Sequence, residues 1–447
     1  MLSDMREKKV YERPLLKSIE SSMPGKAGMP ASVSVVSEID GVSLELLASK
    51  NGTPLFVFSE MQIRSNIRKA RQAFLTRYKS VAFAWSYKTN YLSSICRLFH
   101  EEGSWAEVVS GMEYQKAIDN GCDPTKIIFN GAAKSETDLI RAVQNDSLVH
   151  IDNSRELCLL VSIAKTQNRK ARVAVRVNMD VGTYPRWDRF GFNYENGSAW
   201  QAIAQVMKEE NLELVGLHCH VGTFILSTDI YRKATHKMAD LACRIEREYT
   251  HSLSYIDMGG GFASKNTLKG SYENGAELAP SMDEYAEAIT SVLMNTPFPS
   301  RQMPMLILET GRALIDDAGY LLSSVLTTKR LADGRSNVVI DAGVNLLFTS
   351  FWYNHKVSVV QTPTTCIEET RLTGPLCMNI DVIRDRVSLP LLNPGQFLLF
   401  HYVGAYNVTQ WMQFIEYRPS IVMVKEKGEV KIIRRPEDYD YVTALEE

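Results

Sequence analysis

A lysine at the end of an apolar, β-rich run is the first residue whose setting suggests chemistry. Residues 81–87 read Val-Ala-Phe-Ala-Trp-Ser-Tyr, and Lys88 follows them directly. Removal from water disfavours an ammonium ion, so an apolar lining lowers the pKa of a lysine and frees its lone pair for nucleophilic attack. We therefore expect Lys88 to form a Schiff base. A solvated lysine that merely ends a strand is the commoner arrangement, so this residue alone does not decide the function.

Two further segments could hold an anion such as phosphate. Gly259, Gly260 and Gly261 follow the β-rich run 254–257. Successive glycines expose backbone N–H groups and let a ligand approach closely. The segment Glu309-Thr310-Gly311-Arg312 follows the next β-rich run and adds a cation. A triple glycine also occurs in ordinary turns, but a glycine turn and an arginine at consecutive strand ends together predict a phosphate site.

Two histidines and a glutamate could act on a planar ligand. His218 and His220 share one face of a β-rich run, because alternate side chains of a strand point the same way. No second cluster of His, Cys or acidic residues at ligand spacing lies close in the sequence, so we expect no metal site. His220 is instead expected to be a general acid or base, or a flat surface against the ligand. Glu309 either pairs with Arg312 or keeps a heteroaromatic nitrogen protonated, which makes that ring an electron sink.

Eight short β-rich runs carry these residues, and helix-length segments separate them. The runs are 81–87, 105–109, 127–130, 148–151, 172–177, 214–219, 254–257 and 305–308. This alternation is typical of a parallel α/β fold, and eight repeats predict a (β/α)8 barrel. The site of such a barrel lies where the C-terminal ends of the strands meet, and a polar residue or a glycine stands at or just beyond the end of every run.

The alternation of β-rich runs and helix-length segments ends after Leu322. Short strands joined by Gly and Pro turns are expected at 338–341, 380–382, 397–400 and 421–424, without helical periodicity between them. The strand expected at 55–58 lies outside the eight and is expected to join this second domain. The predicted division is an N-terminal arm (1–35), a segment contributed to the β domain (36–58), the barrel (59–322) and a mostly antiparallel β domain (323–447).

Composition excludes several classes of function. The chain has 447 residues with 45% hydrophobic and 23% charged side chains, and its formal charge of −2 gives no footprint for nucleic acid or an anionic membrane. No apolar run is long enough to span a bilayer, and the N-terminus lacks the apolar core of a secretory signal, so we expect a cytoplasmic protein. The seven cysteines show no CxxC spacing and indicate neither disulfides nor a thiolate metal site.

The order of these segments resembles a known family, the fold-type III pyridoxal 5′-phosphate (PLP) decarboxylases, which include diaminopimelate and ornithine decarboxylase. The resemblance covers roughly residues 53–425 and implies an alanine racemase-like pairing of barrel and β domain. It rests on Tyr87-Lys88, Val109-Ser110-Gly111-Met112-Glu113, Asp188-Arg189-Phe190-Gly191, His218 to Thr223, Asp257 to Phe262, Glu309 to Arg312, Gly374-Pro375-Leu376-Cys377 and Gly404-Ala405-Tyr406.

The resemblance implies a role for each of these residues. Lys88 would bind the PLP aldehyde, His220 would stack on its ring, and Glu309 would pair with the pyridine nitrogen. The phosphate would be held by Thr223, Gly260, Gly261, Gly311, Arg312 and Tyr406. Cys377 looks like the family's catalytic cysteine, which the other subunit of a head-to-tail homodimer supplies to a shared active site. The implied reaction is loss of carbon dioxide from an amino acid, with Cα reprotonated by Cys377 or Lys88.

The chain departs from the family pattern where the substrate is recognised. Diaminopimelate and ornithine enzymes place an acidic residue directly after the cysteine to hold the distal ammonium, but Met378 stands there. The arginine that diaminopimelate decarboxylase uses for the distal carboxylate aligns with Thr349. These differences resemble the biosynthetic branch that acts on conjugated amino acids, such as citryl siderophore intermediates or carrier-bound units. Arg189 and Tyr402 are further candidates for substrate contacts, beside Met378 and Thr349.

Other functions remain possible on the same residues. A free basic amino acid such as diaminopimelate is the alternative substrate. A racemase or aldolase would use the same cofactor but needs a second base on the opposite ring face. A non-catalytic relative that regulates a partner would not need Lys88, Glu309 and Cys377 together. A sugar-phosphate barrel without PLP would explain Arg312 but gives Lys88 no role.

Overall fold

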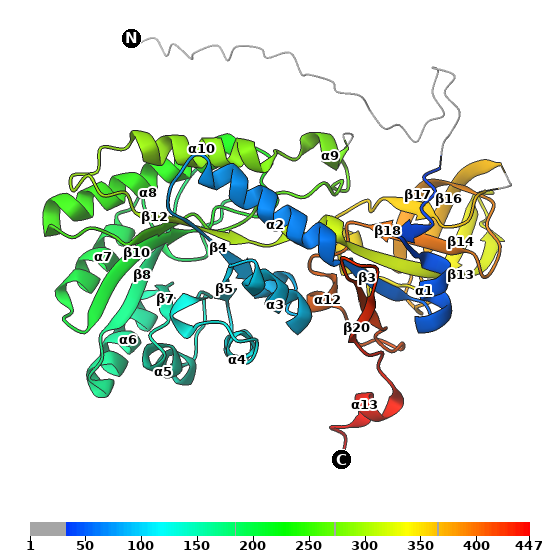
Figure 1. Ribbon diagram of the computed structural model, residues 1–447, viewed down its shortest axis with the longest axis horizontal. Helices are drawn as coiled ribbons and strands as arrows, with labels where there is room; N and C mark the ends of the chain where they lie inside the picture. The colour runs from blue at the N-terminus through cyan, green and yellow to red at the C-terminus, as the bar shows by residue number, and fades with distance from the viewer. Residues whose placement is uncertain (1–32, 184, 272–273, 364–365) are drawn as a thin grey trace, which may run out of the picture.

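Eight parallel strands close into a barrel in the computed structural model, which describes residues 33–183, 185–271, 274–363 and 366–447 (Figure 1). The strands are β4 (Val81–Ser86), β5 (Trp105–Val108), β6 (Ile127–Phe129), β7 (Leu148–Ile151), β8 (Ala171–Asn178), β10 (Leu212–Cys219), β11 (Tyr255–Asp257) and β12 (Met305–Thr310). Pairing of β12 with β4 and of β8 with β10 closes the ring, and a short strand, β9 (Phe192–Asn193), extends β8. The predicted (β/α)8 barrel is confirmed.

Helices surround this barrel. They are α2 (Glu60–Leu75), α3 (Ser93–Glu101), α4 (Gly111–Asp119), α5 (Glu136–Gln144), α6 (Ser154–Gln167), α7 (Ser198–Lys208), α8 (Thr228–Tyr249) and α10 (Met282–Asn295), with the short α9 (Gly275–Leu278) before the last. Polar caps fix where several of them begin: the hydroxyl of Ser59, for example, accepts the backbone N–H of Gln62 at 3.0 Å at the start of α2. No helix in the described ranges is both long and apolar enough to cross a membrane.

The barrel interior is layered, because side chains two apart on a strand face the same way. A lower apolar layer contains Ala84, Ile128, Leu148, Ala174, Tyr255 and Ile307. Two residues further along the same strands stand polar or charged side chains: Ser86, Asn130, His150, Arg176, Asp257 and Glu309. In β10 a register shift between Leu214 and Gly216 brings His218 level with Arg176 and Asp257. The polar layer therefore lies at the C-terminal end of the barrel, as a floor beneath the mouth.

The second domain is a mostly antiparallel sheet beside the barrel (Figure 1). Its strands are β3 (Leu55–Ser59), β13 (Gly319–Arg330), β14 (Ser336–Ile340), β15 (Val357–Val359), β16 (Ile367–Thr373), β17 (Val382–Pro390), β18 (Phe397–His401), β19 (Ile421–Val424) and β20 (Val430–Arg434). The order β17-β16-β14-β13-β3-β19-β20 places the strand from 55–59 at the centre, between β13 and β19. Short elements complete the described chain: β1 (Glu38–Ile39), β2 (Val42–Ser43), α1 (Leu44–Asn51), α11 (Arg312–Ile315), α12 (Asn407–Gln410) and α13 (Tyr439–Thr443).

Several strands of this domain differ from the expectation. The longest, β13, begins at Gly319 inside the stretch assigned to the barrel. The strand expected at 380–382 begins only at Val382 and runs to Pro390, and β15, β16 and β20 were not anticipated. Most of the expected N-terminal arm, residues 1–32, lies outside the described residues.

A buried carboxyl group joins the two domains below the mouth of the barrel. Asp316 accepts hydrogen bonds from Ser264 and from Asn266 (2.8 Å) on the barrel side, and from the backbone N–H of Ala405 (3.3 Å) on the β-domain side. Burial raises the pKa of Asp316 to about 6, although Arg312 and these hydrogen bonds oppose the rise. The ionised form is therefore less favourable in the folded chain than in the unfolded chain.

This shift predicts a pH-dependent stability. A raised pKa in the folded state contributes stability that is complete below the unfolded value and is lost as the pH rises through about 6. The unfolding free energy of the wild type should therefore fall relative to D316N, by up to about 3 kcal/mol, between pH ~4 and pH ~7. Melting temperatures of both proteins across this range measure the difference. D283N, which removes an exposed carboxylate from α10, is the control, and parallel curves for D316N and the wild type would contradict the prediction.

Candidate active site

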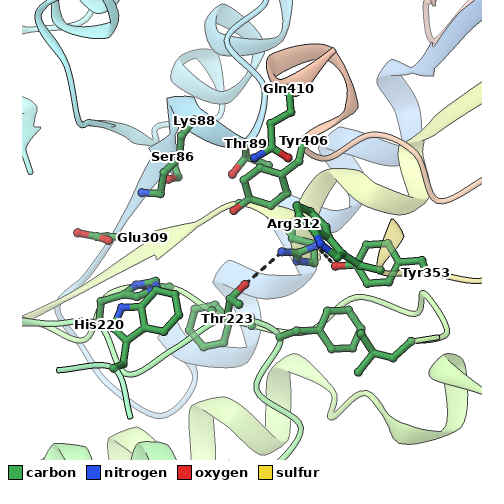
Figure 2. A pocket seen from close by; sticks show the side chains of 18 of the residues that line it. Ser86, Lys88, Thr89, His220, Thr223, Glu309, Arg312, Tyr353, Tyr406 and Gln410 are labelled. Carbon is green, nitrogen blue, oxygen red and sulfur yellow. Dashed lines mark hydrogen bonds between the residues drawn. The ribbon is translucent and has the colours of Figure 1, made fainter. Parts of the chain in front are cut away.

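A cavity of about 650 Å³ opens at the C-terminal ends of the barrel strands, against the β domain. All nine residues expected to bind the cofactor line it: Lys88, His220, Thr223, Gly260, Gly261, Glu309, Gly311, Arg312 and Tyr406. Figure 2 shows Lys88, Glu309 and His220 on one side of this cavity and Thr223, Arg312 and Tyr406 on the other. The cavity thus has an end that carries an amine and a carboxylate, and an end that carries a guanidinium.

Lys88 reaches the cavity from the turn that follows β4. Its side chain is 37% exposed, and Nζ lies 2.7 Å from Oε2 of Glu107, on the neighbouring strand β5. Burial lowers the pKa of Lys88, but the charges of Glu107 and Glu309 outweigh it and raise the pKa above its usual value. The expectation that an apolar lining alone would free the amine is therefore wrong: acidic neighbours keep it protonated until the charge balance of the cavity changes.

Glu309 projects from the end of β12 into the polar floor. Its Oε1 accepts a hydrogen bond from the side-chain amide of Asn130 and lies 3.2 Å from Nε2 of His218. Asn130 also donates to Oε1 of Glu107 at 3.1 Å, so one amide ties the two glutamates together. The Glu309 carboxylate is thereby held in place at the end of the cavity opposite Arg312.

His220 presents a neutral ring to the cavity. Its Nδ1 accepts the backbone N–H of Gly260 at 3.2 Å, and burial lowers the pKa of the imidazole to about 3. The indole ring of Trp187 lies 5.8 Å from it, centroid to centroid. A neutral ring fixed in this way can serve as a flat surface against an aromatic ligand, and it is poorly suited to act as a general acid.

The opposite end of the cavity is built to hold an anion. The guanidinium of Arg312 donates to the hydroxyl of Thr223 (3.1 Å) and to that of Tyr353. Its centre lies 4.7 Å from the ring centroid of Tyr406 and 5.5 Å from those of Phe224 and Tyr353. Hydroxyls and aromatic faces hold the cation in position without neutralising its charge. Arg312 can therefore attract an anionic group.

The glycine turn after β11 forms the wall next to this arginine. Gly261 has a φ of +96°, and a Cβ on Gly260 would collide with the backbone carbonyl of Glu309. The carbonyl oxygens of the turn accept hydrogen bonds from Glu309 N–H, the Tyr231 hydroxyl and Ile225 N–H, which directs them to the protein. Only glycine allows this close approach of the backbone to a ligand.

These residues fit the PLP implied by the family resemblance. One cavity of sufficient size holds an amine for the aldehyde of PLP, a carboxylate for its ring nitrogen, and a cation beside a glycine turn for its phosphate. The buried hydroxyl of Thr89 and the indole N–H of Trp187 also line the cavity, and neither has a hydrogen-bond partner among the described residues. Buried polar groups are normally paired, so both are candidate ligand donors.

The residues expected to contact the substrate do not line this cavity. Cys377 is exposed and Met378 is partly buried, both away from the cavity of their own chain. Arg189 is exposed and stacks on Phe190, with its guanidinium 4.4 Å from the ring centroid. The Thr349 hydroxyl is buried against His355 and Asn407, and so is not available to a substrate. Tyr402 contributes its backbone carbonyl to Asn266. Neither Thr349 nor Arg189 lines the cavity of this chain, so the substrate contacts expected of them stay predictions.

Several lining residues were not anticipated. Ser86, Thr89, Trp187, Phe224, Phe262, Leu268, Lys269, Phe351, Trp352, Tyr353 and Gln410 complete the cavity. Trp352 and Tyr353 follow a short 3-10 turn (Phe348–Phe351), and hydrogen bonds from Lys269 N–H to Trp352 O (2.7 Å) and from Asn354 N–H to Thr267 O (2.8 Å) attach this segment to the loop after β11. The aromatic run from Phe348 to Tyr353 was the sequence signal for three of them, Phe351, Trp352 and Tyr353.

The structure also shows a cluster of histidine and acidic side chains that the spacing in the sequence did not indicate. One ligand atom each of His150, His218, Asp257 and Glu309 lies within 4.8 Å of the others, and all four side chains are buried. They come from β7, β10, β11 and β12. The cluster could not be seen as sequence spacing, because four separate strands assemble it.

The ion pair between Lys88 and Glu107 predicts an amine whose reactivity depends on this carboxylate. E107Q removes the neighbouring negative charge, so the pKa of Lys88 should fall and its amine should react at lower pH than in the wild type. Mass spectrometry after brief exposure to an amine-directed acylating reagent, at a series of pH values, measures the shift. E156Q, which breaks the separate ion pair with Lys134, is the control. An unchanged profile for Lys88 in E107Q would contradict the assignment.

Comparison with known proteins agrees with this geometry. Residues 61–316 match the pyridoxal binding domain of the pyridoxal-dependent decarboxylases. The chain is 32% identical to diaminopimelate decarboxylase of Methanocaldococcus jannaschii, across 90% of this chain and 92% of that protein, and 30% identical to the Aquifex aeolicus enzyme of the same name, across 90% and 94%.

Solved structures give the same result. The crystal structure of diaminopimelate decarboxylase from M. jannaschii superposes with a TM-score of 0.85 at 29% identity, covering 93% of this chain and 97% of that one. Its complex with L-lysine superposes with a TM-score of 0.84. The match includes both the barrel and the β domain. This chain therefore belongs to the pyridoxal-dependent decarboxylases and is a PLP-dependent amino-acid carboxy-lyase.

Proposed function

We propose that the protein decarboxylates a free diamino acid of the diaminopimelate class. The observation that carries this proposal is a cavity with an amine, a ring-facing carboxylate and an anion cradle, in a chain whose relatives named above are diaminopimelate decarboxylases. Those relatives favour diaminopimelate, the alternative substrate of the sequence analysis, over its first choice, a siderophore-type conjugate. None of the relatives named above is an enzyme of siderophore biosynthesis.

The side chains around the cavity divide the work of the reaction. When bound, PLP supplies a conjugated pyridinium ring that accepts the electron pair of the breaking carbon–carboxyl bond. Lys88 would provide the amine for the cofactor's aldehyde, and Glu309 would pair with the protonated ring nitrogen. His220 would offer a flat, neutral surface to the ring. Arg312, with Thr223, Gly260, Gly261, Gly311 and Tyr406, would hold the phosphate.

Cys377 belongs to this mechanism only if a second subunit provides it. The thiol is exposed and does not line the cavity of its own chain, and Ile380, three residues later, is also exposed. A head-to-tail homodimer would bring the thiol to the partner's cavity, where it would return a proton to Cα after carbon dioxide leaves. An exposed apolar side chain in the same short loop supports an interface there.

A mixing experiment tests the roles of Lys88 and Cys377 together. K88A should lack the visible absorption band of lysine-bound PLP and should have no measurable turnover, whereas C377A should keep the band and lose most of its activity. In a shared site, mixing the two inactive variants should restore roughly a quarter of the wild-type activity, because half of the dimers combine one of each chain and contain one intact site. Carbon dioxide release measures the activity.

Two results would count against these roles. A normal visible band in K88A would exclude Lys88 as the cofactor amine. Absence of recovery on mixing, with subunit exchange verified by native mass spectrometry, would exclude a shared site. C366A, which removes an exposed thiol at another position of the β domain, is the matched control for C377A and should remain active.

Lys269 supports a substrate with a second carboxylate. It lines the cavity beside Leu268, on the loop attached to Trp352; it is exposed, and desolvation lowers the pKa of its ammonium group. An ammonium at the wall of a largely aromatic cavity offers an ion pair to a carboxylate at the distal end of the substrate. Diaminopimelate carries such a carboxylate, and lysine and ornithine do not.

A conjugated amino acid is the second candidate, and two positions favour it. Met378 stands where the family places an acid for the distal ammonium, and a thioether cannot pair with that charge. Thr349, at the position of the family's arginine for the distal carboxylate, is buried and uses its hydroxyl within the protein. The aromatic side chains of Phe351 and Trp352 would suit a larger appended group, and Lys269 would suit a carboxylate on it.

A substrate panel with a charge variant distinguishes the two candidates. Diaminopimelate, lysine, ornithine, and citryl- and carrier-conjugated amino acids are incubated with the PLP-loaded enzyme, and products are identified by mass. We expect diaminopimelate to give the highest kcat/KM, and K269M to reduce it up to about fivefold while changing lysine turnover little, as loss of one exposed ion pair predicts.

The control for this panel is K265M, which removes an exposed lysine from the same loop and should behave as the wild type. Preference for a conjugated substrate would replace the first candidate by the second. Equal losses for lysine and diaminopimelate in K269M would show that Lys269 does not recognise the distal carboxylate.

A further inference from the structure

A fully buried carboxyl group lies directly beneath the catalytic glutamate. Asp257 ends β11, and its side chain enters the polar floor in which Glu309, His218 and His150 also lie. Asp257 is 0% exposed and Glu309 is 4% exposed. The mechanism above uses Glu309 but gives no role to Asp257.

The two oxygens of Asp257 have different surroundings. Oδ1 accepts the backbone N–H of Gly259 at 2.8 Å, at the start of the glycine turn. Oδ2 is buried and has no hydrogen-bond partner in the described part of the chain. One carboxylate oxygen of Asp257 lies within 4.8 Å of a carboxylate oxygen of Glu309. Glu309 already accepts a hydrogen bond from Asn130. Two ionised carboxylates this close, away from water, would repel each other strongly.

One proton resolves this conflict, and the surroundings show which group carries it. Asn130 donates a hydrogen bond to Oε1 of Glu309, His218 Nε2 lies 3.2 Å from the same oxygen, and the charges of Lys88 and Glu309 interact. Asp257 has one backbone donor and faces the charges of Glu309 and Glu107. Burial, followed by the charge of Glu309, raises the pKa of Asp257 well above its usual value.

We propose that Asp257 is a positioning residue for Glu309: its protonated carboxyl group donates a hydrogen bond from Oδ2 to the Glu309 carboxylate and leaves one negative charge at the floor of the cavity. The Asp257–Glu309 pair would then carry one negative charge, which matches the positive charge of a protonated PLP ring nitrogen. Asp257 thus links the glycine turn, through Oδ1, to the carboxylate that pairs with the ring. The inference depends on PLP binding and not on the substrate proposed above.

A divalent cation bound by the same four groups is the other way to offset two buried carboxylates. His150 Nδ1, His218 Nδ1 and Asp257 Oδ2 have no hydrogen-bond partner among the described residues, so they could serve as ligands. A cation would require Asp257 to be ionised. The two arrangements therefore predict opposite responses to an amide at this position.

The test compares D257N with D257A. Asparagine keeps the shape, accepts the Gly259 N–H with its oxygen and donates to Glu309 with its nitrogen, but cannot ionise. The apo-enzyme of D257N should bind PLP within about threefold of the wild-type Kd, whereas D257A should bind ~tenfold or more weakly, the usual effect of losing a hydrogen bond to a charged group. Absorbance titration measures Kd, and melting temperature reports folding.

Infrared spectroscopy gives a readout that does not depend on cofactor binding. The spectrum of the wild-type apo-enzyme minus that of D257N should show the C=O stretch of a protonated carboxylic acid, which a carboxylate lacks. This difference decides the protonation state even if D257A does not fold. Metal analysis of the enzyme as purified should show no stoichiometric divalent ion.

Four outcomes would overturn the proposal. They are a tenfold loss of PLP affinity in D257N with an unchanged melting temperature, wild-type affinity in D257A, a missing carboxylic-acid band, and a divalent metal present at one equivalent and lost in D257N. The first and last would identify Asp257 as an anion or a metal ligand.

Discussion

The structure depends on holding a negative charge at the bottom of a barrel from which water is largely excluded. An isolated carboxylate in such a place would take up a proton, because burial strongly disfavours its charged form. Glu309 accepts a hydrogen bond from the amide of Asn130, and its charge interacts with that of Lys88. Glu107 accepts a hydrogen bond from the same Asn130 amide, and its Oε2 lies 2.7 Å from Nζ of Lys88. The floor of the cavity is therefore a set of charges and donors that are stable only together.

The barrel produces this set through strand periodicity. Each strand contributes an apolar residue to the core and, two positions later, a polar residue to the floor, so the same geometry that packs the core also presents the polar groups. Tyr255 and Asp257 on β11, and Ile307 and Glu309 on β12, are two such pairs. A change in register of one residue would turn both sets of side chains out of the barrel interior.

The anion end of the cavity depends on both domains. Arg312 comes from the barrel, Tyr353 and Tyr406 come from the β domain, and the backbone N–H of Tyr406 donates to Thr89 O at 2.9 Å. Tyr406 has a φ of +64°, which a bulky residue adopts only where the surroundings enforce it. The two domains are therefore coupled at the place where the phosphate is expected, and separation of the domains would dismantle the cradle.

The sequence was sufficient for the barrel and for the cofactor end of the cavity, because both depend on local signals. A polar residue or a glycine stood at or just beyond the end of each β-rich run. Lys88 followed its run directly, and the glycine turn and Arg312 came within four residues of theirs. The pKa of Lys88 was predicted with the wrong sign, since Glu107 stands on a different strand and its distance from Lys88 is a tertiary property. The cluster around Asp257 was missed for the same reason, and β13 because it crosses the domain boundary.

The substrate end could not be predicted because its walls come from segments that lack regular periodicity. Alignment of Thr349 with a substrate-binding arginine fixed its position in the chain but not the direction of its side chain, which turns to His355 and Asn407. Lys269 lies in a loop without any family motif and reaches the cavity only because that loop pairs with residues 352–354. Apart from Tyr406, the residues expected to bind the cofactor thus stand at or near strand ends that the barrel fixes. Lys269 and Met378 stand in loops, which can change in sequence without disturbing the barrel.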